Sequence, residues 1–483
     1  MSSHIENTAW KQAELDHARP GTKLDAARLA QKGEHGGRRL APFYKVMPGM
    51  PIAVDAFRYG KIPGVKAYFL THAHSDHYTA LNEKWANGPI YCSETTGNLI
   101  RLMLGVNSKW IHPVPMDVPT LVPETEVTVT LVEANHCPGS VLFLFEGRRT
   151  VNAGDSTFKS PHVGSPRVFR YLHCGDFRAS PQHALHAAIK GKKLDIIYLD
   201  TTYLNPKYCF PPQRQVIDAC ATLATRLVLG TEPTNSSESD LTGKISMKPK
   251  PSIDVWARPI VKGQHNDDAS LREGRTLVMV GTYSIGKERI VKAIANALSS
   301  KVYCDKRKAA ILRCQDDPEL HALLTNDPYE AQIHLVPLGA LNRDKIGDYL
   351  SQFKGAYTRV VGFRPTGWTY SPPAGTDTLP ALAPLITRMQ SRTFLPSSLV
   401  PTRNSTPRLM LYGVPYSEHS SFLELSCFAL STHWDKIIAT VNVGTESGRG
   451  KMNRWFEKWE SEIKRRREKG ENGMVGFRSI EYW

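Results

Sequence analysis

The fold of this chain is indicated by one short stretch, Thr71-His72-Ala73-His74-Ser75-Asp76-His77. It follows an apolar run at residues 67–70 that is typical of a buried strand. The cluster is therefore expected on the loop that leaves a strand end, where α/β proteins place their sites. The first two histidines can point to one side, and the aspartate and the last histidine can face a second point after the turn. This pattern suits two adjacent metal ions. A histidine-rich surface loop is the alternative.

Three later strands also end in candidate ligands. The strands expected at 127–131, 168–172 and 194–199 are followed by His136, Asp176 and Asp200, respectively. Asp176 comes after Gly175, which lets the backbone approach closely, and a carboxylate there can bridge two metal ions. Each of these residues alone is more often a cap or turn residue. Four strand ends that each offer a ligand type form a specific signal of a metal site.

These residues carry a resemblance to a known family. Further matching blocks are spread from about residue 41 to 460, among them Gly175-Asp176-Phe177-Arg178, Phe363-Arg364-Pro365-Thr366-Gly367-Trp368 and Ser417-Glu418-His419-Ser420-Ser421. The chain resembles the metallo-β-lactamase superfamily and, within it, the β-CASP nucleases of DNA interstrand cross-link repair, relatives of Artemis and Apollo. The resemblance implies an α/β fold, a metallo-β-lactamase αββα sandwich with an inserted β-CASP α/β domain.

The domain order follows from this resemblance and from composition. Residues 1–40 are polar and are expected to be loosely ordered. The sandwich is expected at 41–210 and 409–470, the β-CASP domain at 211–408, and a tail at 471–483. Two polar or proline-rich stretches of the inserted domain, 231–274 and 371–406, are expected to be mobile loops. A helix near 452–469 carries Trp455, Phe456 and Trp459 on one face, which favours packing against the sheet.

The constellation also predicts a role for each site residue. One metal ion would be held by His72, His74, His136 and Asp176, and the other by Asp76, His77 and the shared Asp176. Zinc is the expected cofactor, as one or two divalent ions, with Mg²⁺ or Mn²⁺ as alternatives at the second position. His419 resembles the β-CASP histidine near the second metal and the leaving group, and Asp200 resembles the acidic residue that orients it. A core histidine is the alternative for His419.

A glycine turn at residues 281–288 nearly spells a nucleotide-binding P-loop. Glu288 stands where a serine or threonine should ligate magnesium, which excludes nucleotide hydrolysis. The turn still offers N–H groups to an anion at a helix start, and Lys287 adds charge, so a DNA phosphate is the expected ligand. A plain helix start with an exposed lysine is the alternative. Ser417 and Ser420, which flank His419, are further candidates to hold a terminal phosphate.

Composition also indicates which kind of partner the protein binds and in which compartment it acts. The net charge of +15 over 483 residues favours a polyanion such as DNA, although a solvated basic surface would give the same value. None of the eight cysteines forms a CxxC pair, which disfavours a zinc finger and fits a reducing compartment. No apolar run reaches membrane length. The run Lys464-Arg465-Arg466-Arg467-Glu468-Lys469 is typical of nuclear targeting, and equally of a solvated helix end.

One departure from the wider superfamily bears on the substrate. Val443 stands where many relatives supply a further metal-binding histidine, and the resemblance implies that DNA-acting members have valine there. We therefore expect a nuclear 5′-to-3′ DNA exonuclease of interstrand cross-link repair, acting on 5′-phosphorylated ends and cross-linked DNA. A structure-selective endonuclease like Artemis and an inactive DNA-repair scaffold are the alternatives. An RNA endonuclease and a small-molecule hydrolase are disfavoured.

Overall fold

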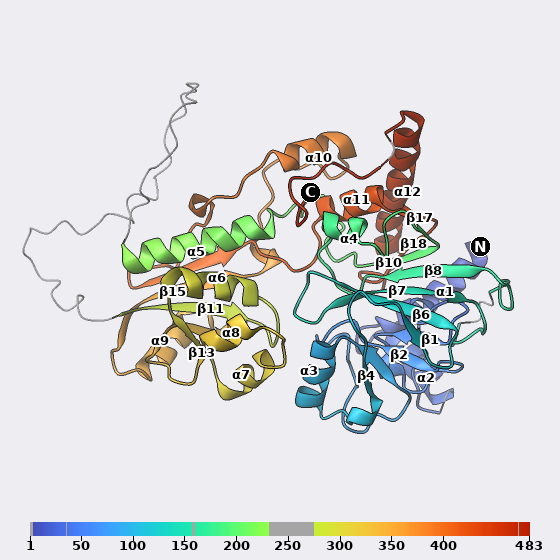
Figure 1. Cartoon of the computed structure of the whole chain (residues 1–483), viewed down its shortest axis with the longest axis horizontal. Helices are drawn as coiled ribbons and strands as arrows, with labels where there is room; N and C mark the ends of the chain where they lie inside the picture. Colours follow the sequence, from blue (N-terminus) through green and yellow to red (C-terminus); the bar gives the residue numbers. More distant parts are fainter. Residues whose placement is uncertain (1–2, 35, 157–159, 231–274, 472) are drawn as a thin grey trace, which may run out of the picture.

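The computed structural model describes residues 3–34, 36–156, 160–230, 275–471 and 473–483. It has two lobes that lie side by side (Figure 1). The loop expected at 231–274 lies outside the described residues. Within them, no helix has both the length and the apolar character that a membrane span needs.

The first lobe contains two sheets that pack face to face (Figure 1). The smaller sheet is parallel, with the order β1 (Ile52–Val54), β2 (Ala67–Phe69), β3 (Ile90–Cys92) and β4 (Ile111–Pro113). The larger sheet has the order β18 (Ile437–Ala439), β10 (Ile196–Leu199), β8 (Val168–His173), β7 (Val141–Arg148), β6 (Val127–Glu133) and β5 (Thr120–Val122). Alternate residues of β6 and β7 fill the space between the sheets against Phe69.

Helices cover the outer faces of both sheets. Trp85 and α3 (Glu94–Leu104) pack on the smaller sheet. The larger sheet packs against α11 (Phe422–Ser431) and α12 (Glu446–Glu468), and α12 buries Trp455 and Trp459 there as its sequence predicts. The expected αββα sandwich is therefore confirmed.

The second lobe is an all-parallel α/β unit. Its sheet has the order β13 (Leu324–Thr325), β12 (Lys301–Tyr303), β14 (Ala331–Pro337), β11 (Arg275–Thr282), β15 (Tyr357–Pro365) and β16 (Leu409–Val414). One face is covered by α5 (Gln213–Leu229), α6 (Glu288–Leu298), α7 (Lys306–Leu312) and α8 (Pro318–Leu323), and the other by α9 (Arg343–Ser351). Its strands are nearly all apolar because both faces are buried.

The described part of the N-terminal segment is mostly helical, where the sequence predicts a loosely ordered segment at 1–40. They form α1 (Ser3–Asp16) and α2 (Lys23–Glu34). Trp10 packs on Phe43 with ring centroids 4.8 Å apart, and Ala13 is fully buried. The Asp16 carboxylate accepts a hydrogen bond from the Tyr59 hydroxyl at 2.7 Å. The prediction was wrong because it relied on the polar composition of the whole segment, whereas only a few residues hold α1 in place.

Three further expectations differ from the structure. The return to the first lobe does not begin at 409, because β16 pairs with β15 and buries Met410, Tyr412 and Val414 in the second lobe. The stretch 371–406 contains α10 (Leu382–Gln390), which packs on the first lobe's core. The segment expected as a tail at 471–483 ends in Trp483, which is fully buried in that same core. In each case apolar side chains fix a segment that overall composition marks as polar or peripheral.

The two lobes present the carboxyl ends of their strands to one cleft. In the first lobe β6 and β8 run in the same direction, because both are antiparallel to β7, and β10 is parallel to β8. In the second lobe β11, β15 and β16 are parallel and end at the same edge. Residues that follow these strands line a cleft of about 650 Å³, which is where α/β sheets bind ligands.

Candidate metal centre

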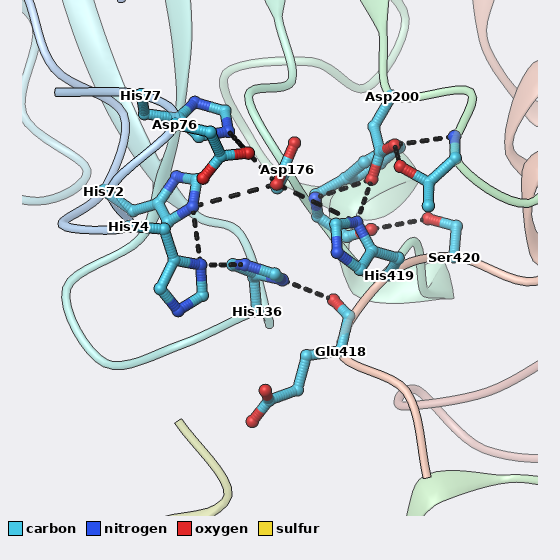
Figure 2. Close-up of polar contacts among 12 residues, drawn as sticks. His72, His74, Asp76, His77, His136, Asp176, Asp200, Glu418, His419 and Ser420 are labelled. Atoms are coloured by element: carbon cyan, nitrogen blue, oxygen red, sulfur yellow. Dashed lines mark hydrogen bonds and ion pairs between the residues drawn. The ribbon is translucent and has the colours of Figure 1, made fainter. Parts of the chain in front are cut away.

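Three imidazole rings converge at the strand ends of the first lobe (Figure 2). His74 Nδ1 lies 3.0 Å from His72 Nε2 and 3.1 Å from His136 Nε2. Burial lowers the pKa of His72 and of His136 well below the ordinary value. Both rings are therefore neutral, which is the form that binds metal ions.

The opposite nitrogen of each ring faces a hydrogen-bond acceptor. His136 Nδ1 lies 2.8 Å from the Glu418 carbonyl oxygen, and His74 Nε2 lies 3.2 Å from the Ile285 carbonyl oxygen. His72 Nδ1 lies 3.0 Å from Thr71 Oγ1, whose own proton goes to Asp55. These acceptors hold the ring protons on the outer nitrogens.

The donor set therefore fits a cation. With the protons held outside, the lone pair of His74 Nδ1 meets those of His72 Nε2 and His136 Nε2 at 3.0 and 3.1 Å, where no hydrogen is left to share. A divalent ion that accepts all three lone pairs would relieve this repulsion. Cys137 is also near this group, but burial raises the pKa of its thiol well above the ordinary value.

A second group adjoins the first through Asp176. The carboxylate Oδ2 of Asp176 lies 3.2 Å from His77 Nε2, 3.8 Å from His72 Nε2 and 3.9 Å from His419 Nδ1. Asp176 thus occupies the central position that the sequence predicts for a shared ligand. Asp76 lies on the open side, with its side chain 78% exposed and Oδ2 3.6 Å from His77 Nε2 (Figure 2).

Asp55 supports this group, although no role is predicted for it from the sequence. It follows β1, and its Oδ2 lies 2.7 Å from His77 Nδ1. Burial alone would lower the pKa of His77, but the carboxylates of Asp176 and Asp55 raise it well above the ordinary value. The contact directs Nε2 of His77 toward Asp176. The sequence does contain a signal for this role. Asp55 directly follows β1, which is the neighbour of β2 in the sheet, so its carboxylate lies near the histidines that follow β2.

We expect Asp55→Asn to weaken metal binding by about 10- to 100-fold, the usual cost of losing a residue that orients a ligand. The affinity for Zn²⁺ can be measured by calorimetric titration of the metal-depleted protein. Asp348→Asn, on the exposed face of α9, is the matched control. Unchanged affinity in Asp55→Asn would show that His77 needs no such support.

His419 enters the same cluster from the segment after β16. Its Nδ1 lies 2.9 Å from Oδ2 of the buried Asp200, and its ring is 4.8 Å from that of His136. Burial alone would lower the pKa of His419, but Asp200 and Asp176 raise it to about 9. Because Asp200 engages Nδ1, Nε2 is the ring nitrogen available to a substrate. The pairing of Asp200 with His419 is the arrangement that the family resemblance implies.

Lys287 is not presented to a phosphate as predicted. Its side chain is 5% exposed and forms an ion pair with Glu418. Its backbone N–H also donates to Glu418 Oε1 at 2.8 Å, and Gly286 N–H donates to Glu288 Oε1 at 2.9 Å. Carboxylates of the chain itself occupy the anion position at the start of α6. The sequence could not show this, because Glu418 stands far along the chain.

The two serines also differ from expectation. Ser420 Oγ donates to the Phe177 carbonyl at 2.7 Å and accepts from Ala179 N–H at 2.9 Å, so it braces the Asp176 loop. Ser417 lines the cleft, but its hydroxyl bonds the backbone of His419 at 3.0 and 3.1 Å. Neither hydroxyl is free to take a phosphate in this conformation.

Comparison with known families agrees with this architecture. Residues 50–231 match the family described as Beta-lactamase superfamily domain, and residues 318–445 match the one described as DNA repair metallo-beta-lactamase. The protein is thus an α/β protein of the metallo-β-lactamase class with a DNA-repair extension.

Individual relatives narrow the assignment. The chain is 39% identical to "DNA cross-link repair protein pso2/snm1" of Schizosaccharomyces pombe, over 87% of this chain and 65% of that protein. It is 36% identical to "DNA cross-link repair protein SNM1" of Arabidopsis thaliana, over 87% of this chain and 70% of that protein. The chain belongs to the SNM1/PSO2 family of DNA cross-link repair proteins. A more distant relative, "5' exonuclease Apollo" of Gallus gallus, is 28% identical over 79% of this chain and 60% of its own.

Proposed function

We propose that this protein is a metal-dependent DNA nuclease that degrades strands from 5′ to 3′ in interstrand cross-link repair. The observation that carries the proposal is the set of three inward lone pairs beside the shared Asp176, with the His419–Asp200 pair next to it. Zinc suits the imidazole-rich group formed by His72, His74 and His136. The group formed by Asp76, His77 and Asp176 contains more oxygen and also suits Mg²⁺ or Mn²⁺.

The chain's own residues then have distinct tasks. Divalent ions, when bound, lower the pKa of water and neutralise charge that develops on a phosphate. His74 and His136 are held in the ligand orientation by carbonyls of Ile285 and Glu418. Asp200 stabilises the protonated form of His419, which can donate a proton from Nε2 to the leaving oxygen.

A DNA strand suits the rest of the cleft. The net charge of +15 favours a polyanion, and Lys45 and Arg58 are cationic side chains that line the cleft. The polarity of degradation rests on the likeness to the relative named a 5′ exonuclease. A structure-selective endonuclease is the second candidate, because Lys287, Ser417 and Ser420 are already engaged and provide no end-specific anchor.

We expect a 5′-phosphorylated strand to be degraded about tenfold faster than one with a 5′-hydroxyl, since a terminal phosphate carries more negative charge than an internal diester and would be attracted more strongly by the cleft cations Lys45 and Arg58. The measurement is the product ladder from a 3′-labelled strand, compared for the two 5′ ends. Products released from the 3′ end, or internal cuts at equal rates, would favour the endonuclease.

The nucleus is the compartment that this activity requires. Lys464, Arg467 and Lys469 of the basic run are exposed at the end of α12 and accessible to a transport receptor. Arg465 and Arg466 also contact Glu462 and Glu471, so part of the run has a structural role.

A further inference from the structure

One aromatic ring stands open at the rim of the catalytic cleft. Trp368 is 71% exposed, the largest value for any large apolar side chain among the described residues. It lines the same cleft as His419 and Asp176. An isolated exposed apolar residue needs no explanation, but a tryptophan beside the candidate catalytic residues does.

The backbone that carries Trp368 is held firmly. It lies in the short helix η7 (Gly367–Thr369), directly after β15. Thr366 N–H donates to the Val414 carbonyl at 3.0 Å, and the Thr369 hydroxyl donates to the Thr366 carbonyl at 2.8 Å. A Cβ at Gly367 would lie 2.5 Å from the Tyr203 hydroxyl, so glycine lets this turn rest directly on Tyr203. The ring therefore stands on a fixed base.

The contacts of Trp368 leave most of its side chain open to the cleft. Its ring meets Tyr203 at 5.7 Å and Tyr208 at 6.3 Å between centroids, both in an edge-on geometry. Tyr203 in turn lies 6.0 Å from the His419 ring. The tyrosines thus support the tryptophan and connect it to the candidate catalytic histidine. Stacked nucleotides are spaced about 3.4 Å apart, so the ring lies within a few nucleotides of His419.

We infer that Trp368 is a stacking platform for one nucleobase of the strand that is being cut. The inference rests on the proposed nuclease function and adds a base-binding subsite to it. Stacking on an aromatic face is tolerant of base identity, because every base has a π-face. An open ring also leaves the edges of the base uncontacted, so a base that carries the remnant of a cross-link fits the same subsite.

The test combines a protein variant with a missing base. Trp368→Ala should raise KM for a 5′-phosphorylated single strand by roughly 5- to 100-fold with a much smaller change in kcat, whereas Trp368→Phe should keep most of the affinity. An abasic residue is then placed in turn at each of about the first four nucleotides. For the wild-type protein, one position should raise KM by a similar factor. For Trp368→Ala, the KM for the same abasic strand should equal the KM for the intact strand.

Tyr329→Ala is the matched control, because Tyr329 is 46% exposed and lies at the amino end of β14, away from the cleft. An unchanged KM in Trp368→Ala, a full abasic penalty that persists in this variant, or a loss confined to kcat would each overturn the platform. Failure of the wild-type protein to cleave DNA with any divalent metal would instead refute the proposed function.

Discussion

The Asp176→Asn variant is expected to lose phosphodiester cleavage by at least about 10³-fold while it keeps its fold. Asp176 Oδ2 lies within 3.2–3.9 Å of His77, His72 and His419, so this carboxylate adjoins both groups of histidines. The substitution removes its negative charge and one of its two ligand oxygens. Because Asp176 stands on a loop after β8 and not in the apolar core, little stability should be lost.

Cleavage of a labelled strand, metal content and circular dichroism together check this expectation. Asp348→Asn again controls for the chemical change at a site outside the cleft. Near-normal turnover in a metal-replete Asp176→Asn protein would refute the shared-ligand role. An unfolded variant would assign Asp176 a structural role instead.

A large loss of stability is expected for Arg178→Met, about 3–5 kcal/mol. Arg178 is fully buried, and its guanidinium donates to Glu424 Oε1 at 2.9 Å, to the Ser417 carbonyl at 2.7 Å and to the Pro211 carbonyl at 2.9 Å. Removal of the cation leaves the Glu424 carboxylate buried without its charge partner. It also frees two segments that lie at the junction of the lobes.

Urea unfolding followed by tryptophan fluorescence measures this loss. Arg178→Met combined with Glu424→Gln should recover part of it, because the stranded charge is removed. Arg214→Met, which breaks an exposed pair with Asp218, should change stability by less than about 1 kcal/mol. Equal stabilities of the two arginine variants would contradict a structural role for the buried pair.

The sequence predicts the first lobe's half of the site well. Alternation of apolar and polar residues predicts β6, and the strands expected at 168–172 and 194–199 correspond to β8 and β10. The ends of these strands bring His136, Asp176 and Asp200 to one edge. This works because strand direction and side-chain spacing are local properties. The pairing of His419 with Asp200 came from resemblance alone, since nothing local connects two residues in different lobes.

The contacts between lobes could not be predicted. The Glu418 carboxylate fills the helix start that was expected to bind DNA, and the carbonyls of Glu418 and Ile285 hold His136 and His74. Backbone carbonyls carry no sequence signal. The position of α1 depends likewise on a few distant contacts, such as that between Asp16 and Tyr59.

The carbonyls of Ile285 and Glu418 link the metal site to the junction of the two lobes. The ligands His74 and His136 belong to the first lobe, whereas the groups that set their protons belong to the second. Any opening of the lobes would release both rings to rotate and to change tautomer, and metal affinity would fall with it. By reciprocity, an ion bound by His74 and His136 would stabilise the junction of the two lobes by the same free energy. Metal binding at these two histidines and closure of the lobes would therefore favour each other.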